Sequence, residues 1–265
     1  MDISKNLQHE AVSVKTVSTE SANQITERFY EVDAHQKLDA LINIFSHFKP
    51  ENVIVFTNTK IEAKEIAENL QKAKIDALAI HGDLEQYERN DVLVQFSNRS
   101  CPILVATDVA ARGLDIKELS MVINYDIPHG DETYTHRIGR TGRAGRDGLA
   151  FTLFSEYEAD KAYEYKNESR LFEDAGELKK VNGFEMKPKY ITLVIEGGKK
   201  DKVRAGDLLG ALTGDAGLKG SSIGKIDIYE RQSYVAIERA LIDEAHKKLS
   251  NGKIKGKKFS IWILD

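Results

Sequence analysis

Short apolar runs alternate with helix-like segments up to residue 154 of this chain. The runs lie at 53–56, 77–80, 103–106, 121–125 and 150–154, and segments with apolar residues at helical spacing lie at 34–48, 60–72 and 85–97. Runs that are apolar at successive positions are typical of strands buried on both faces of a parallel sheet, and the helical segments provide the crossovers. The pattern predicts an α/β fold with helices on both faces of a parallel sheet.

Polar side chains follow three of these predicted strands. They are Thr57-Asn58-Thr59, His81-Gly82-Asp83 and Thr107-Asp108. Ligands of parallel α/β sheets bind beyond the carboxyl ends of the strands. We therefore expect a functional site where these segments meet.

The end of the chain follows a different order. Strands are predicted at 191–195, 226–229, 234–237 and 259–263, with helices at 204–213 and 238–249. The order βαββαβ is the ferredoxin-like split motif. We predict a linker at 1–20, a first domain at 21–185 and a second domain, called the tail, at 186–265.

Charge is distributed unevenly between the two parts. Residues 1–188 carry a net charge of −9 and residues 189–265 a net charge of +5, which together give the −4 of the whole chain. A basic unit attached to an acidic one indicates a polyanionic partner recruited electrostatically. Chance variation is the alternative, and charge alone does not decide between the two.

Composition excludes several classes of protein. No apolar run approaches the ~20 residues needed to span a bilayer, so we expect no membrane association. The beginning of the chain, MDISKNLQHE, lacks the features of a secretory signal. Cys101 is the single cysteine, which excludes an internal disulfide and a cysteine-ligated metal cluster. We expect a cytoplasmic location and no metal ligands in this chain.

The most specific motif is the segment 136–143, His-Arg-Ile-Gly-Arg-Thr-Gly-Arg. Its arginines, Arg137, Arg140 and Arg143, recur at every third position. Guanidinium groups bind phosphate oxygens with paired hydrogen bonds and remain charged at any working pH. Glycines between them let the backbone approach a polyanion closely. A surface helix with salt bridges would not explain these glycines, so the motif indicates phosphate binding.

A second motif, 105–116, begins in a buried strand and continues as Thr-Asp-Val-Ala-Ala-Arg-Gly-Leu-Asp-Ile. Together with 136–143 it resembles motifs V and VI of the DEAD-box RNA helicases of superfamily 2. The segment 53–60 resembles motif IV, and 81–89, with its Gln-x-x-Arg spacing, resembles the element after it. All occur in the order of that family, so the resemblance implies a RecA-like second helicase domain.

The resemblance also implies roles for individual residues. Arg140 and Arg143 correspond to the catalytic arginines that reach the γ-phosphate of ATP, and Asp115, beside Gly113, corresponds to the group that binds the ATP ribose. Gln86 and His136 would orient neighbours, and Arg137 would be internal. The implied contacts to the RNA backbone are Thr59, Gly82, Arg89, Thr107, Asp108 and Arg112.

Some parts of the family pattern are missing from this chain. It contains no GxxxxGK[ST] loop, no Asp-Glu-Ala-Asp and no Ser-Ala-Thr. The family carries these in a first RecA-like domain, which holds the ATP phosphates and Mg²⁺. Residues 3–12 resemble the end of that domain, so we expect this chain to be the carboxyl-terminal part of a helicase. Alone it should bind RNA without ATPase activity. A natural protein that lost its first domain is the alternative.

The tail resembles the RNA recognition motif of the bacterial DbpA/YxiN group within that family, over 203–214, 224–226 and 252–257. This implies binding of a 23S ribosomal RNA hairpin near the peptidyl-transferase centre and action on pre-50S particles. Tyr234 stands at one base-stacking position, while Thr192 and Gln232 occupy the others. The lysines of its loops are an RNA surface or, alternatively, a solvated rim. The predicted RNA contacts of the tail are Lys199, Lys202, Arg204, Tyr234, Lys253, Lys255 and Lys257.

Two other functions stay open at this point. A non-catalytic RNA-binding adaptor would carry the same tail without ATP turnover. Half of a DNA helicase of superfamily 2 would carry similar motifs, although the segment 136–143 and the appended RNA-recognition-like domain favour RNA.

Overall fold

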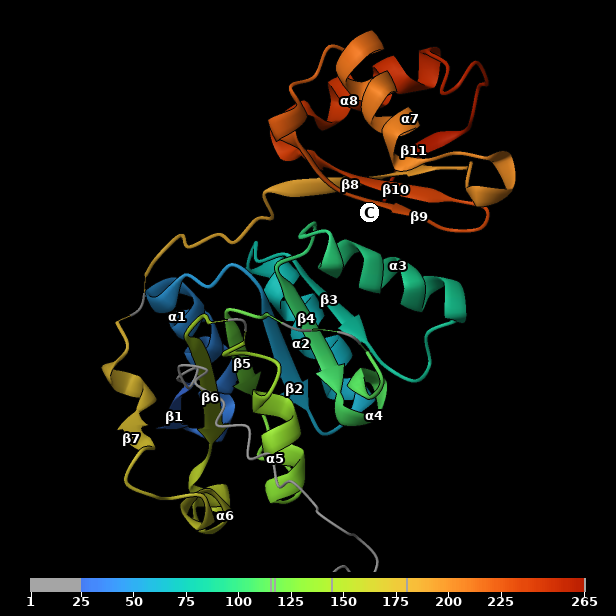
Figure 1. Cartoon of the computed structure of the whole chain (residues 1–265). Coiled ribbons are helices and arrows are strands. Elements are labelled where there is room, and N and C mark those ends of the chain that lie inside the picture. Colours follow the sequence, from blue (N-terminus) through green and yellow to red (C-terminus); the bar gives the residue numbers. More distant parts are fainter. Residues whose placement is uncertain (1–24, 115, 117, 144, 180, 265) are drawn as a thin grey trace, which may run out of the picture.

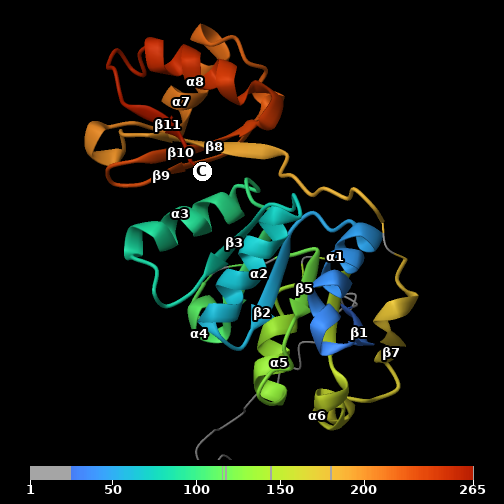
Figure 2. The same ribbon diagram turned by 180° about the vertical axis from the view of Figure 1, so that it is seen from behind.

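The computed structural model describes residues 25–264 with the exception of residues 115, 117, 144 and 180. The predicted linker at 1–20, the resemblance at 3–12 and the predicted ribose contact Asp115 lie outside the described residues. Figures 1 and 2 show the chain from opposite sides, with one sheet above the other.

The larger sheet has seven strands in the order β3-β4-β2-β5-β6-β1-β7, and all of its pairings are parallel. Its strands are β1 (Ile25–Glu31), β2 (Val53–Thr57), β3 (Ala77–Ile80), β4 (Ile103–Thr107), β5 (Met121–Asn124), β6 (Gly148–Phe154) and β7 (Leu171–Asp174). Its helices are α1 (Lys37–Phe48), α2 (Lys60–Lys72), α3 (Gln86–Ser97), α4 (Asp108–Ala111), α5 (Asp131–Ile138) and α6 (Ala159–Glu164).

Both faces of this sheet are covered, as the apolar runs predicted. Alternate residues of β2 point to opposite faces: Val53 and Val55 join a core with residues of α1 and α2, whereas Ile54 and Phe56 join a core with residues of α3 and α4. This confirms the predicted parallel α/β sheet. No described helix is long and apolar enough to cross a membrane.

Strands β1 and β7 were not predicted, because charged residues interrupt their apolar pattern. Their charges are paired within the protein: Arg28 donates to Glu173 at 3.0 Å and Arg170 to Glu27 at 2.7 Å. The charged stretch 156–188 contains the short helix α6 and the edge strand β7. Ion pairs between side chains thus stabilise strands that an apolar pattern cannot indicate.

The tail confirms the predicted βαββαβ order. It comprises β8 (Tyr190–Ile195), α7 (Ala205–Gly210), β9 (Ile223–Ile228), β10 (Ser233–Glu238), α8 (Ile242–Asn251) and β11 (Ile261–Ile263). Its antiparallel sheet has the order β11-β8-β10-β9. Leu193, Ile195 and Val235 pack with residues of α7 and α8 in the core of the tail. The neighbouring Val194 and Tyr234 therefore point to the other face.

That other face packs on α3 of the larger unit, which lies directly beneath the tail in both views. Val94 of α3 forms an apolar cluster with Val194 and Tyr234. The Tyr234 hydroxyl donates to Asp91 at 3.2 Å, and Thr192 Oγ1 lies 2.7 Å from Ser100 Oγ. Further contacts are Asn98 to Thr192 at 3.4 Å, Lys225 to Ser97 at 3.1 Å and Arg239 to Asp76 at 3.0 Å. The tail sheet is thus docked on the first unit.

Candidate functional site

A pocket of about 540 Å³ lies between the segments 108–112 and 133–143. The two most specific sequence motifs therefore meet in space. Side chains of both signs line the pocket, and they include Asp108, Arg112, His136, Arg137, Arg140 and Arg143. Three arginines from one short segment make this pocket suited to an anionic ligand.

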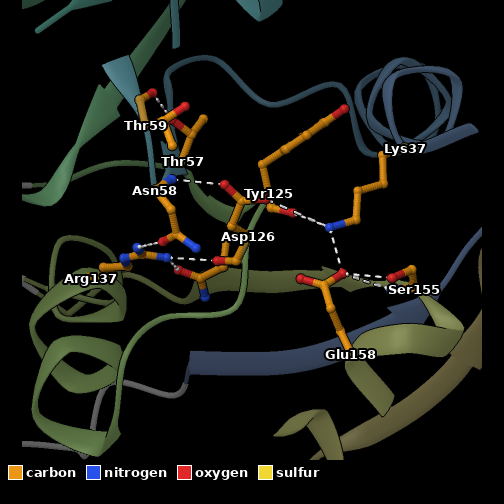
Figure 3. A network of polar contacts seen from close by, with 10 residues as sticks. Lys37, Thr57, Asn58, Thr59, Tyr125, Asp126, Arg137, Ser155 and Glu158 are labelled. Carbon is orange, nitrogen blue, oxygen red and sulfur yellow. Dashed lines mark hydrogen bonds and ion pairs between the residues drawn. The ribbon is translucent and has the colours of Figure 1, made fainter. Parts of the chain in front are cut away.

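Arg137 is the centre of the polar network behind this pocket (Figure 3), and it is only 1% exposed. Its Nε and one Nη bind the two oxygens of Asp108, each at 2.7 Å. The remaining donors reach Asn124 Oδ1 at 3.2 Å, the Asp126 carbonyl at 2.8 Å and Asn58 Oδ1 at 3.3 Å. All five guanidinium N–H groups are thus used, which places Arg137 inside the protein.

Arg140 and Arg143 line the pocket together with Arg137 and are less buried than it is. Arg140 is half-buried and donates to the carbonyls of Leu114 at 2.7 Å and Ile116 at 3.3 Å. Arg143 is exposed, and its Nε donates to the Gly139 carbonyl at 2.6 Å. Backbone carbonyls orient both guanidinium groups, and among the described residues neither of the two is paired with a carboxylate.

The glycines of the arginine motif have packing reasons that differ from the sequence-based interpretation. Gly142 has φ +63°, and a Cβ there would lie 2.5 Å from Ile25 Cγ1. A Cβ on Gly139 would lie 3.0 Å from the Thr135 carbonyl oxygen. The interpretation that these glycines admit a polyanion is therefore unnecessary, because backbone conformation and close packing already require them.

Thr59 and Gly82 lie in the loops that follow β2 and β3, the two strands on either side of β4 in the sheet. Thr59 is the N-cap of α2 and accepts from the Glu62 amide at 3.2 Å. The next residue, Lys60, donates to Asp83 at 2.8 Å, which joins the two loops. Gly82 is exposed, and a Cβ added to it would extend into open space. The predicted assembly of these strand ends is observed, and their contact with RNA stays a prediction.

The other predicted RNA contacts surround α4. Thr107 is its N-cap, Arg89 donates to the carbonyl of Ala110, and Asp108 is engaged by Arg137. These three side chains therefore hold the backbone of the motif, and any contact with RNA would be additional. Arg112 is exposed and lines the pocket, and Gly113 has φ +77°.

The two basic loops of the tail, far apart in sequence, form one surface. Lys255 Nζ donates to the Lys202 carbonyl at 2.8 Å and lies 3.7 Å from Asp207. Lys202 and Lys255 have φ values of +61° and +53°, which set the direction of each loop. The cations of this surface, all of them at least partly exposed, are Lys199, Lys200, Lys202, Arg204, Lys253, Lys255, Lys257 and Lys258.

The structure contradicts the prediction that Tyr234 stacks an RNA base. Tyr234 is 5% exposed, packs with Val94 and Val194, and donates to Asp91. Burial of this hydroxyl raises its pKa, and the charge of Asp91 raises it further. Thr192, at another expected stacking position, is fully buried in the same contact. This face of the tail sheet packs on α3 of the same chain, which explains why it carries no exposed aromatic residues for base stacking at positions 192 and 234.

Sequence analysis missed Lys37 and Asp126, which Figure 3 shows in this network, and Asn124, which accepts a hydrogen bond from Arg137. Asp126 follows β5, so the rule that identified polar residues after the other strands would have found it. Lys37 lies in a helix and gives no sequence signal. Among the described residues, no three His, Cys, Asp or Glu side chains are grouped as a metal site.

Two carboxyl groups of this network have shifted pKa values. Burial raises the pKa of Glu62 to about 8, and a hydrogen bond with Asp126 contributes to the shift. Burial also acts to raise the pKa of Glu158, but hydrogen bonds from Lys37 and Ser155 outweigh it and lower that pKa. The network therefore holds a neutral acid and a charged one near the same amine.

Comparisons with known proteins match both units. The family model described as Helicase conserved C-terminal domain matches residues 36–145, and the DbpA RNA binding domain matches residues 192–263. The ATP-dependent RNA helicase DbpA of Escherichia coli is 40% identical over 99% of this chain, and its counterpart in Bacillus subtilis is 32% identical over 95%. The chain spans 58% and 57% of the lengths of these relatives.

A solved structure agrees with these matches for the larger unit. The Escherichia coli DEAD-box protein SrmB, crystallised with regulator of ribonuclease activity A, is 31% identical with a TM-score of 0.53. The match covers 63% of this chain and 95% of that one.

Proposed function

Because this chain belongs to the DbpA-type DEAD-box RNA helicases, we propose that its first domain supplies half of an RNA-stimulated ATPase and that its tail binds RNA. The proposed bounds are 21–185 for the first domain and 186–265 for the tail. The observation that carries the proposal is the pocket that Arg140 and Arg143 line together with the buried Arg137.

The proposed role of Arg140 and Arg143 is electrostatic. Charge develops on the transferred phosphoryl group of ATP, and fixed guanidinium groups stabilise it without reorganising. Asp115, beside Gly113, would accept a hydrogen bond from the ATP ribose. The ATP phosphates and Mg²⁺ would be held by a first RecA-like domain, and we propose no Mg²⁺ ligand within this chain.

RNA would follow the edge formed by the ends of β2, β3 and β4. Thr59 and Gly82 offer an exposed hydroxyl and an open backbone, and Arg112 offers a charge at the pocket. Such groups contact the sugar–phosphate backbone and position RNA without selecting a sequence. Thr107, Asp108 and Arg89 would contribute by holding α4 in place.

The tail would select the RNA through its basic loops. We propose a 23S ribosomal RNA hairpin near the peptidyl-transferase centre as the target and pre-50S particles in the cytoplasm as the setting. Lys199, Lys202, Arg204, Lys253 and Lys257 are exposed in two loops that the bond from Lys255 to Lys202 joins, and phosphate contacts there would supply affinity. Tethering raises the local concentration of RNA at the helicase core.

ATP turnover tests the catalytic half of the proposal. The amino-terminal part of the Escherichia coli relative, joined to this chain as a chimaera, should hydrolyse ATP when RNA is present. Arg140→Lys and Arg143→Lys should each lower kcat, whereas Lys64→Met, on the exposed face of α2, should not. A folded chimaera that binds RNA without hydrolysing ATP would favour the non-catalytic adaptor. ATPase activity of this chain alone would also contradict the proposed division of the site.

Binding to a panel of hairpins tests the RNA half. This chain should prefer the ribosomal hairpin over unrelated RNA hairpins and over a DNA hairpin of the same sequence. Equal affinity for the RNA and DNA versions would instead favour the DNA-helicase alternative.

A further inference from the structure

Lys37, the first residue of α1, carries a buried amine that belongs to none of the sequence motifs. The residue is 8% exposed. Its Nζ donates to the Tyr125 carbonyl at 3.1 Å and pairs with Glu158 at 2.8 Å, and it lies 3.7 Å from Asp126 Oδ1. Buried charges in proteins are paired and hydrogen-bonded, and these partners attach the amine to the end of β5.

Asp126 connects this amine to the arginine motif (Figure 3). Its Oδ1 faces Lys37, and its Oδ2 accepts a hydrogen bond from the backbone N–H of Asn58 at 2.8 Å. Its backbone carbonyl accepts from Arg137 at 2.8 Å, and Arg137 also donates to Asn58 Oδ1 at 3.3 Å. A single residue thus lies between the ammonium of Lys37 and the guanidinium of Arg137.

Lys37 also balances an excess of carboxyl groups. Asp126 and Glu158 face it directly, and burial together with the neighbouring Asp126 raises the pKa of the Glu62 carboxyl group. Without the ammonium, the carboxylates of Asp126 and Glu158 would lose their compensating charge and would take up protons or move apart. Either response would disturb the bonds from Asp126 to Asn58 and Arg137.

We propose that Lys37 is a positioning residue for the arginine pocket, which it orders through Asp126, Asn58 and Arg137 without lining the pocket itself. The pocket is lined by Arg137 but not by Lys37. Because Arg137 and the pocket-facing Arg140 and Arg143 belong to one segment, displacement of the first alters the other two. For its effect on ATP turnover, the inference rests on the proposed function.

The geometric link can be tested on this chain alone by nuclear magnetic resonance. In Lys37→Met, the Nε–H signal of Arg137 and the amide signal of Asn58 should shift, and their exchange with water should accelerate by about tenfold or more. Lys37→Arg should restore both signals, and Lys64→Met should leave them unchanged. A folded Lys37→Met with both signals as in the wild type would overturn the proposal.

If Lys37→Met does not fold, a double variant tests the same link between Lys37 and Arg137. Lys37→Met combined with Glu158→Met replaces the ion pair by apolar contacts, which proteins often tolerate well. Asp126 still lacks its amine in this variant, so both signals should change in the same way. Wild-type signals in the folded double variant would reject the link through Asp126.

Turnover by the chimaera tests the functional consequence. A misplacement of about 1 Å can lower a rate on the order of 10²-fold, so Lys37→Met should lower kcat about tenfold or more, with hairpin affinity of the tail unchanged. A purely structural role would lower the folded fraction and leave kcat per folded molecule intact, which would refute the proposal. A wild-type chimaera without ATPase activity would refute the proposed function instead, and the resonance test would still decide the role of Lys37.

Discussion

Replacement of Tyr234 by alanine should release the tail from the larger unit while leaving the tail folded. Tyr234 contributes to the docked face rather than to the core of the tail, where Leu193, Ile195 and Val235 pack. Truncating a buried aromatic residue costs about 3–5 kcal/mol. Of this, loss of the hydroxyl bond to Asp91 accounts for about 1 kcal/mol, so Tyr234→Phe should retain most of the docking.

Small-angle X-ray scattering provides the assay. The radius of gyration should rise in Tyr234→Ala and stay near the wild-type value in Tyr234→Phe. Amide hydrogen exchange should accelerate in α3 around Val94, which the tail covers. Unchanged scattering and unchanged exchange in Tyr234→Ala would refute the reasoning that this ring holds the two units together.

The same variant separates docking from base stacking. Loss of a stacked aromatic costs about 1–3 kcal/mol per base, which is roughly a tenfold loss of RNA affinity. Because Tyr234 is covered by α3, we expect hairpin affinity to change by less than about twofold when the ring is removed. A tenfold loss of hairpin affinity in Tyr234→Ala, with affinity retained in Tyr234→Phe, would instead indicate that the ring stacks on a base.

Three further predictions concern charge. Because the pKa of Glu62 is raised from 4.5 to about 8 in the folded state, the unfolding free energy should fall as pH rises from about 5 to 8. After a discount for solvent screening, the fall in unfolding free energy over this pH range should be about 1–2 kcal/mol. Urea titrations at several pH values measure it, and Glu62→Gln should abolish the pH dependence. Arg137→Lys should lower stability by about 2–4 kcal/mol in thermal unfolding, because lysine cannot replace the paired bonds to Asp108. The double variant Lys253→Ala with Lys255→Ala should weaken hairpin binding. It should also reduce the slope of log affinity against log salt concentration by about 1–2, and an unchanged slope would reject an RNA role for these loops.

The order of the elements was predictable where burial leaves a simple pattern. Val53 to Phe56 is apolar at every position because both faces of β2 are covered. The turn after each such strand then located the site, since parallel strands end at one edge. The meeting of 108–112 with 133–143 was not predicted, and the pocket that they share shows it.

What could not be predicted depends on contacts between distant residues. Strand β1 contains Glu27 and Arg28, whose partners Arg170 and Glu173 are more than a hundred positions away. The burial of Tyr234 requires α3, which belongs to the other unit. The periodicity of apolar residues indicates only which residues share a face of one helix or strand. It therefore cannot predict ion pairs or packing contacts between elements that are far apart in the sequence.

The contact between Arg137 and Asp108 has an electrostatic consequence for any phosphate that approaches. Two opposite charges joined at 2.7 Å act at a distance as a dipole, and the field of a dipole decays faster than that of a single charge. Of the three arginines that recur in the motif, Arg140 and Arg143 are the two without a carboxylate partner in the part of the chain that the structure describes, so an incoming anion senses chiefly their charges. The charge of Arg137 acts only over a short range, at the ends of β2, β4 and β5. Its hydrogen bonds to Asn58, Asp108, Asn124 and Asp126 hold these three strand ends together.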